Sequence, residues 1–456
     1  MSLSKFLVVF CYIAASITVA TMVYLGPAGW DGDVYWTAAQ SLHAGGDPYA
    51  QGIAVQQAFH DQAVKDPRTH PPMTYVYSPI TLPMLCLLGN LPGWLMAYLY
   101  YLSMAIGLGL QLWAGWQMAP EAERRWLKYL LPAVAFFPGL LNEDVLLSGN
   151  IAYLLYGLVL SAAVPGWKRN RWHWYYLAVL AASICKAPLL TLLALPVVLG
   201  RRQWLAACTT AAIGSTLFLA QAKLWPALFA EYFRAVQLQF DWNLDFGVSP
   251  AGLLGKALVQ SGLRYQIPTT ILYIAFAFVI GTLMLWTARQ SRTDAPVRAA
   301  WVPVALVGTV LLNPRIKEYD VAALTIPLVL IAARMLRYLE GEPTEPFPRV
   351  ALQLFGSAVK AHTNPREAHG RLTRNSLRSL LTALGWFLTI NLAASGDAWK
   401  PLELSLLIVL FGMGTWLTLH HARPLPAVAP HVSDWERTSR VSRAPEYASP
   451  REARQP

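Results

Sequence analysis

Long apolar runs separated by short polar segments are the feature that most constrains this chain. The run 6–25 is about 20 residues long, which is the length that an α-helix needs to cross the hydrocarbon core of a bilayer. Only 13% of the residues are charged, against about a quarter in an average soluble protein. These features predict an all-α polytopic membrane protein. The further clear runs are 204–222, 266–287, 319–334, 377–394 and 404–419.

The basic excess of the chain fits this class. Its 36 Lys and Arg against 25 Asp and Glu give a net charge of +11, and basic residues of membrane proteins concentrate in cytoplasmic loops. No basic run with interleaved aromatics resembles a nucleic-acid surface, so no nucleic-acid partner is expected. The four cysteines lie in apolar runs without CxxC spacing and are predicted to be small buried residues: Cys11, Cys86, Cys185 and Cys208.

Charge also predicts the orientation. The run 6–25 follows Lys5 and is longer than the roughly 7–15 apolar residues of a cleaved signal peptide, so we expect a retained anchor and a cytoplasmic N-terminus. The segment 26–77 has five aspartates and only Lys65 and Arg68, which predicts an outer loop. Arg-rich loops alternate with it, and about twelve crossings then place both termini in the cytoplasm.

These assignments divide the chain as follows. A membrane module covers 1–336, with a first outer loop at 26–77 and a second at 223–265. A cytoplasmic loop (337–375), a transmembrane pair (376–420) and a disordered tail (421–456) complete the chain. Within the first loop, 34–43 and 53–64 are predicted short helices, the second suited to the membrane interface. The stretch 78–118 breaks at Leu91-Pro92-Gly93, and we prefer a re-entrant half helix before one full span to two full spans.

Polar connectors interrupt pairs of short apolar segments. They read "NEDVLLSGN", "CKAP" and "NPRIKEYD", and each falls on the predicted outer side. Charge and irregular backbone at membrane depth are tolerated where they line a cavity or are buried in protein. The connectors, the aspartates of the first loop and the segment "FDWNLDFGVSP" are therefore expected to converge on one outward-facing cavity.

Two aspartates stand directly after the first apolar run. In a half-desolvated site, Asp31 or Asp33 would have a raised pKa and could act as a general base on a sugar hydroxyl. The competing interpretation is structural, because Asp is a favoured N-cap and either residue could begin the predicted helix 34–43.

Basic side chains interrupt the later connectors. Lys186 lies between two apolar segments, where it could bind a phosphate or extend to the interface. Arg315 and Lys317 share a turn with Glu318 and Asp320, and they could bind an anion or pair with those carboxylates. Asn150 is a weaker candidate at the end of another connector.

Several chemistries lack the residues that they need. His60, His70 and the cysteines form no group with metal-ligand spacing, and the chain has no phosphate-binding loop, dinucleotide fingerprint or nucleophile elbow. "DGD" at 31–33 has the form of a metal-binding motif for nucleotide sugars, but it falls outside the cytoplasm. We therefore expect neither a metal nor another cofactor.

Short motifs along the chain resemble glycosyltransferase family 87. "DGDVYWTAAQSLHAGGDPY" is similar to the first-loop signature of that family, and "YVYSPITLPML", "LSGNIAYLLYGLVL", "CKAPLL" and "LLNPRIKEYD" are similar to its later motifs. The resemblance implies a GT-C membrane fold and a polyprenyl-phosphate-linked sugar donor. It places the loop aspartate of the family at Asp31, four positions before Tyr35, and the family lysine at Lys186. Glu318-Tyr319 stands where the family often has His-Tyr.

The resemblance and the residues agree on one mechanism. Asp31, with Asp33 as the alternative, would accept the acceptor proton in an inverting displacement, while Lys186 with Arg315 or Lys317 would stabilise the departing phosphate. We expect this on the outer face of a bacterial cytoplasmic membrane, with a glycolipid or glycan as acceptor. The resemblance implies mannose as the sugar. A transporter or flippase without chemistry, or a non-catalytic assembly protein, is the alternative. The expected substrate-binding residues are Tyr35, Tyr77, Asn150, Glu318 and Tyr319.

Overall fold

Helices make up every regular element that the computed structural model describes. The described residues are 30–63, 74–121, 123–124, 127–128, 130, 150–242, 244–291, 295–339 and 400–421, and no strand occurs in these ranges. In chain order the elements are α2 (Trp30–His43), α3 (Pro48–Ala63), η1 (Pro79–Thr81), α4 (Leu82–Gly89), α5 (Gly93–Met118), α8 (Ala152–Arg169), α9 (His173–Cys185), η2 (Ala187–Leu199), α10 (Arg201–Leu224), α11 (Pro226–Asp241), α12 (Pro250–Gln260), α13 (Gln266–Gln290), α14 (Ala295–Leu311), η3 (Glu318–Leu324), α15 (Thr325–Leu339) and α18 (Lys400–His421).

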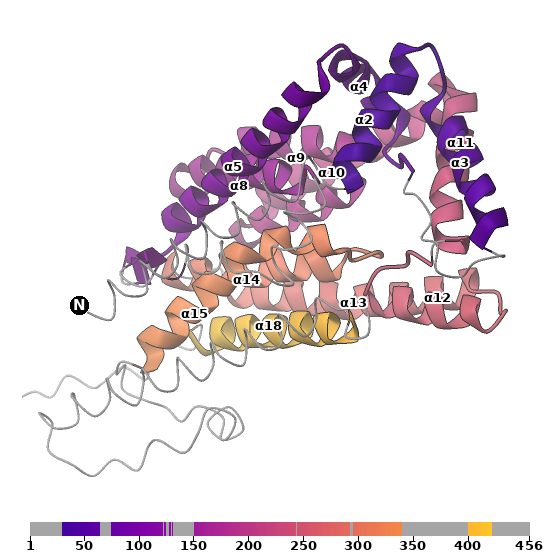
Figure 1. Cartoon of the computed structure of the whole chain (residues 1–456). Helices are drawn as coiled ribbons and strands as arrows, with labels where there is room; N and C mark the ends of the chain where they lie inside the picture. Colours follow the sequence, from indigo (N-terminus) through magenta and orange to yellow (C-terminus); the bar gives the residue numbers. More distant parts are fainter. Residues whose placement is uncertain are drawn as a thin grey trace, which may run out of the picture.

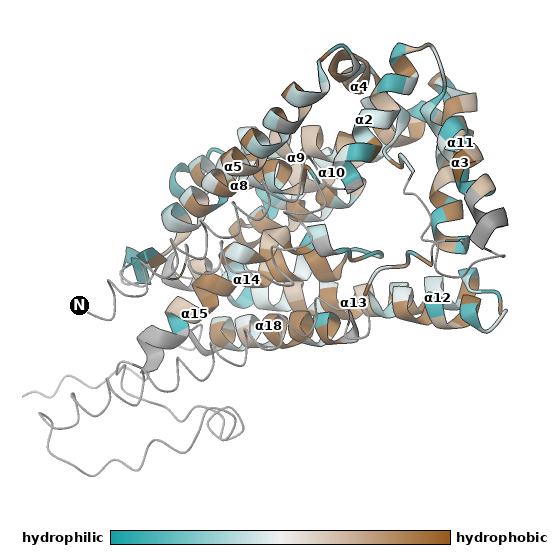
Figure 2. Ribbon diagram, viewed as in Figure 1, coloured by the Kyte–Doolittle hydropathy of each residue, from teal (hydrophilic) through white to brown (hydrophobic). Residues whose placement is uncertain are grey.

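Four of these helices are long and apolar enough to cross a membrane: 93–118 in α5, 201–224 in α10, 266–290 in α13 and 402–419 in α18. Three of them confirm predicted runs. Ile267, Ile271, Ile274 and Phe278 follow one stripe of α13, and each is more than 60% exposed. Water would disfavour such a stripe, whereas lipid tails accommodate it. Figure 2 shows the apolar character of α13 and α18. The predicted runs 6–25 and 377–394 lie outside the described residues, and the count of twelve crossings stays a prediction.

Two hydrophobic clusters hold the described helices together. The larger one centres on α14, whose Trp301, Val304 and Leu306 are almost completely buried among η2, α13, η3, α15 and α18. The smaller cluster joins α2, α3, α4 and α11 around Tyr49, Ile53 and Tyr75. In Figure 1 the helices of the smaller cluster stand at one end of the molecule, beyond the ends of α9 and α10. The described parts of the predicted first outer loop are thus packed against α4 and α11.

Of the predicted breaks in the apolar segments, those at "CKAP" and "NPRIKEYD" are present, whereas the one at "NEDVLLSGN" lies outside the described residues except for Asn150. Lys186 separates α9 from η2, a 3₁₀ helix of 13 residues. Runs of this length are uncommon because 3₁₀ hydrogen bonds have poorer geometry. Here the Trp301 indole donates to the Leu195 carbonyl at 2.9 Å, and Tyr175 donates to the Leu192 carbonyl. The predicted span 319–334 is also divided, into η3 and α15, and it is therefore not one continuous membrane helix.

Three expectations about helix boundaries need correction or can be refined. The helix predicted at 34–43 begins at Trp30, so Asp31 and Asp33 lie within its first turn and neither is its N-cap. The helix predicted at 53–64 begins at Pro48. The second outer segment, predicted only as a polar loop, contains α11 and α12. In 78–118, the short α4 is followed by the 26-residue α5, which is the arrangement expected of a half helix before a full span.

Candidate functional site

A cavity of about 520 Å³ lies where the predicted polar segments meet. Its lining includes Asp31 of α2, the stretch 76–78, Asn150, Lys186 and the turn 313–317. The second outer segment adds Asp245. The expected convergence on one cavity is therefore confirmed for the described residues. Of the connector "NEDVLLSGN", only Asn150 is described.

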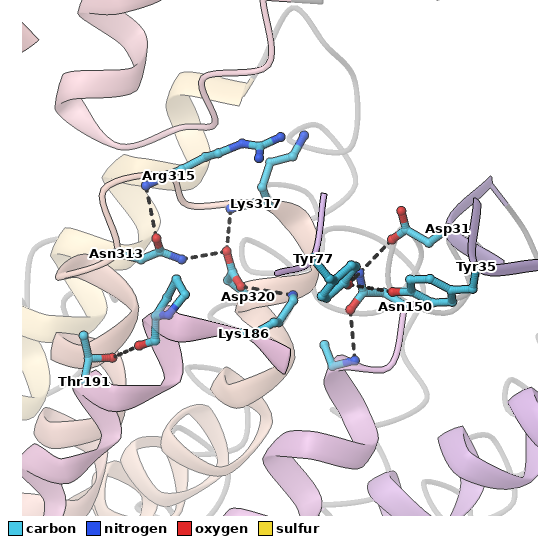
Figure 3. Close-up of polar contacts among 12 residues, drawn as sticks. Asp31, Tyr35, Tyr77, Asn150, Lys186, Thr191, Asn313, Arg315, Lys317 and Asp320 are labelled. Atoms are coloured by element: carbon cyan, nitrogen blue, oxygen red, sulfur yellow. Dashed lines mark hydrogen bonds and ion pairs between the residues drawn. The ribbon is translucent and has the colours of Figure 1, made fainter. Parts of the chain in front are cut away.

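One wall of the cavity carries a single carboxylate among neutral hydrogen-bonding groups (Figure 3). The Asn150 amide donates to Asp31 Oδ2 at 2.7 Å, while its own Oδ1 accepts from the Ala152 N–H at 3.0 Å. The latter bond ties Asn150 to the first turn of α8 and fixes which way the amide points. The Tyr77 hydroxyl lies 3.4 Å from the same amide nitrogen and 2.6 Å from the Tyr35 hydroxyl.

The electrostatics of Asp31 follow from this wall. Burial raises the pKa of the Asp31 carboxyl above its usual value, and the hydrogen bond from Asn150 together with the charge of Lys186 offsets only part of that rise. A carboxylate with a raised pKa is a stronger base than one in water, and it still ionises near neutral pH when the rise is moderate.

Asp33 occupies a different position. It is exposed, and it lines a second cavity of about 400 Å³ instead of the first. Residues that are two positions apart on an α-helix are separated by about 200° around its axis. This separation accounts for the opposite directions of Asp31 and Asp33. The two aspartates of "DGD" therefore do not face one common site.

The opposite wall is built from ion pairs. Lys186 Nζ lies 3.6 Å from Asp320 Oδ1 and 3.7 Å from the centre of the Tyr319 ring. The other carboxylate oxygen of Asp320 accepts from the Asn313 amide at 2.8 Å and from the Lys317 backbone N–H at 3.0 Å. Asp320 thereby joins the break after α9 to the turn after α14 (Figure 3).

Arg315 and Lys317 share a second carboxylate. Arg315 pairs with Asp245 Oδ2 and Lys317 with Asp245 Oδ1. Burial alone would raise the pKa of Asp245, but the two cations outweigh that effect and hold its pKa below the usual value. Arg315 also donates to Gln239 Oε1 at 3.0 Å. The two cations therefore line the cavity and pair with Asp245, a carboxylate outside their own turn, and their binding of an anion stays a prediction.

The second outer segment is fixed against this turn. The Val248 N–H donates to the Ile316 carbonyl at 2.9 Å. Gly247 has φ of 70°, and a Cβ there would lie 2.3 Å from Ile316 O, so only glycine fits this approach. This contact brings Asp245 to the two cations.

The structure unites most of the predicted site residues. Asp31, Tyr77, Asn150, Lys186, Arg315, Lys317 and Tyr319 all line the cavity. Tyr35 reaches it through Tyr77, while the side chain of Glu318 lies outside the described part of the structure. Sequence reasoning gave no site role to Asp245, Asn313 or Gln239, and it named Asp320 only as a possible partner of Arg315 and Lys317. The segment "FDWNLDFGVSP" pointed to Asp245, but its two cationic partners are about 70 residues later and have no signal in its local sequence.

Among the described residues there is no group of three or more His, Cys, Asp or Glu side chains that could hold a metal ion. The expectation of metal-independent chemistry is not tested by this observation and stays a prediction.

Apolar helices, divided membrane segments and a charged cavity define a multi-pass membrane protein with a polar site. The profile of glycosyltransferase family 87 matches residues 75–314. The match covers more than half of the chain, which therefore belongs to glycosyltransferase family 87, a family of the GT-C type. No curated protein matches the chain. The family match contains Tyr77, Asn150 and Lys186, begins after Asp31 and ends directly before Arg315.

Proposed function

We propose that this protein transfers a sugar from a polyprenyl-phosphate donor to a lipid or glycan acceptor, with inversion at the anomeric carbon. The observation that supports the proposal is that one cavity has a carboxylate among neutral partners on one wall and three cations on the other. The mannosyl group is our first candidate for the sugar. We place the cavity at the outer face of a bacterial cytoplasmic membrane, with both termini in the cytoplasm.

The reaction is a single displacement. Asp31 accepts the proton of the acceptor hydroxyl as that oxygen forms its bond to the anomeric carbon. The bond between the anomeric carbon and the phosphate oxygen breaks, and its electron pair leaves with the polyprenyl phosphate. The leaving group needs no general acid, because a phosphate ester oxygen leaves as a stable anion.

Charge on the leaving phosphate grows as the bond breaks, so cations that are already in place stabilise the transition state more than the ground state. Lys186 contacts this phosphate, with Arg315 and Lys317 on its far side. Asp245 bridges the last two cations with one oxygen each, which is how two phosphate oxygens would bridge them. The donor phosphate therefore takes the place of Asp245 at one or both cations.

Neutral groups of the cavity bind the sugar. The hydroxyls of Tyr35 and Tyr77 and the amide of Asn150 surround Asp31, where they can bond to sugar hydroxyls next to the reacting carbon. The ring of Tyr319 supports Lys186. No metal is needed in this scheme, and treatment with EDTA should leave the activity intact.

The test is a transfer assay with purified full-length protein, a panel of radiolabelled polyprenyl-phosphate sugars and a membrane-lipid extract as the source of acceptor. Wild type should convert one donor to a labelled product, and Asp31→Asn should abolish that product. If an intact wild-type protein in an acceptor-containing extract used none of the donors, the proposed reaction would be wrong.

A further inference from the structure

The second cavity, of about 400 Å³, lies on the other face of α2. Its size is within the roughly 300–1,000 Å³ of small-molecule sites. Helices α2 and α3 form its sides, and Thr74 and Tyr75 close it. Val34 and Thr74 line both cavities. A ligand in the second cavity is therefore separated from the first by the width of these two side chains.

Polar side chains follow one stripe of α2 into this cavity. Asp33, Thr37 and Ser41 are spaced by four residues, so they lie on one face of the helix. Gln51 of α3 stands in the same lining. None of these four side chains has a hydrogen-bond partner within the described ranges, although Ser41 is only 8% exposed. Polar side chains that line a cavity offer hydrogen-bond donors and acceptors to a ligand, and a ligand hydroxyl can replace the water bound to them.

The two cavities differ in charge. Lys186, Arg315 and Lys317 line the first, whereas the described lining of the second has no basic residue and includes the carboxylate of Asp33. An anionic phosphate would be repelled there. Hydroxyl, amide and carboxylate groups beside the apolar surfaces of Val55 and Tyr75 suit a neutral ligand with many hydroxyls and apolar C–H faces, which is a carbohydrate.

We propose that the second cavity binds the carbohydrate part of the acceptor, so that α2 separates acceptor recognition from the reaction. This inference rests on the proposed function. A sugar held by Asp33, Thr37 and Ser41 extends its reacting hydroxyl past Val34 to Asp31. Gly52 sets the width of the cavity, because a Cβ at this position would lie 3.0 Å from Thr74 Cγ2.

The first experiment separates acceptor from donor binding. In the transfer assay described above, the double variant Thr37→Val with Ser41→Ala removes two hydroxyls with little change in volume. The half-saturating amount of acceptor extract should rise about tenfold, since two neutral hydrogen bonds are lost, while the half-saturating donor concentration stays at the wild-type value. Ser261→Ala with Thr270→Val is the matched control, because these hydroxyls are exposed and line neither cavity. Unchanged acceptor saturation, or an equal rise for the donor, would overturn the inference.

The second experiment does not need turnover, so it distinguishes failure of this inference from failure of the proposed function. Thr37→Cys is placed in full-length protein in which Cys11, Cys86, Cys185 and Cys208 are replaced by alanine, and its reaction with a small thiol reagent is followed. Methyl α-mannoside, methyl α-glucoside or methyl α-arabinofuranoside should slow the labelling, and inorganic phosphate should not. Thr270→Cys is the control and should react at the same rate with or without glycoside. Protection by phosphate, or by none of the glycosides, would show that the cavity is not a carbohydrate site.

Discussion

The charged groups on the two walls of the first cavity differ in their partners. Asp31 is the only carboxylate that the described residues place on its wall, and it bonds to the neutral amide of Asn150. In contrast, Lys186, Arg315 and Lys317 each have a carboxylate partner. A general base is stronger when no cation lies at contact distance, because a close cation would lower its pKa and its affinity for a proton. A phosphate-binding cation needs the reverse, since an isolated buried amine tends to lose its charge.

The comparison also shows what substrate binding must do. On the Asp31 wall, an acceptor hydroxyl only adds to existing neutral contacts. On the cation wall, a phosphate has to compete with Asp245 and Asp320. The base is therefore ready before the substrate arrives, and the phosphate site is completed by exchange of one anion for another.

The largest effect should come from the base itself. Asp31→Asn keeps the shape of the side chain and removes the proton acceptor, so kcat should fall by roughly 10²-fold or more, with little change in the half-saturating donor concentration. Steady-state rates with labelled donor measure both values.

Asp33→Asn is the matched substitution one helical face away. This variant should need more acceptor for half-saturation, whereas its kcat should not change. The reverse pattern, with Asp33→Asn abolishing turnover and Asp31→Asn retaining it, would exchange the roles of the two aspartates.

The next effect concerns the opposite wall. Lys186→Ala removes a charged hydrogen-bond donor to the phosphate, which corresponds to roughly 10- to 100-fold in kcat/KM for the donor. Acceptor saturation should stay the same. Lys186→Arg keeps the charge and serves as the control, with a smaller loss. Should Lys186→Ala weaken acceptor binding more than donor use, its role at the phosphate would be wrong.

These two walls also differ in how far the sequence predicts them. Lys186 stands out because a lysine inside an apolar segment has few structural reasons to be there, and the same argument predicts the break after Cys185. Asp31 stands out by its position after the first apolar run. The helical class and three of the described membrane spans follow from apolar length alone.

What the sequence does not show is which charges meet. Asp245 and Arg315 are 70 positions apart, and Lys186 and Asp320 are further apart still, so only the folded chain brings them together. Local pattern also could not separate Asp31 from Asp33, because the decision depends on whether the helix starts at Trp30 or at Val34. The four-residue difference turns both aspartates from expected caps into side chains that face different cavities.

A smaller and opposite effect is expected at the counter-ion of the cation wall. Asp245→Asn keeps a similar shape but removes the charge that competes with phosphate for Arg315 and Lys317. The half-saturating donor concentration should decrease several-fold, and inhibition by the product polyprenyl phosphate should become stronger. Asp241→Asn is the control in the same outer segment, because Asp241 bonds to Tyr265 and lines neither cavity. Weaker donor binding in Asp245→Asn would instead mean that Asp245 holds the cations in place and is not displaced.

The smallest effect is a shift in the pH dependence. Asn150→Ser retains an oxygen near the Ala152 N–H but is too short to donate to Asp31. The hydrogen bond from Asn150 lowers the pKa of Asp31, so its loss raises that pKa further. Asp31 acts as a base only when ionised, and activity is lost as the pH falls through this pKa. The acidic limb of the rate profile should therefore move to higher pH. Gln40→Ser removes an amide of α2 that bonds to the Gly89 carbonyl, away from Asp31, and its profile should match the wild type. A shift to lower pH in Asn150→Ser would be incompatible with Asp31 as the ionising base.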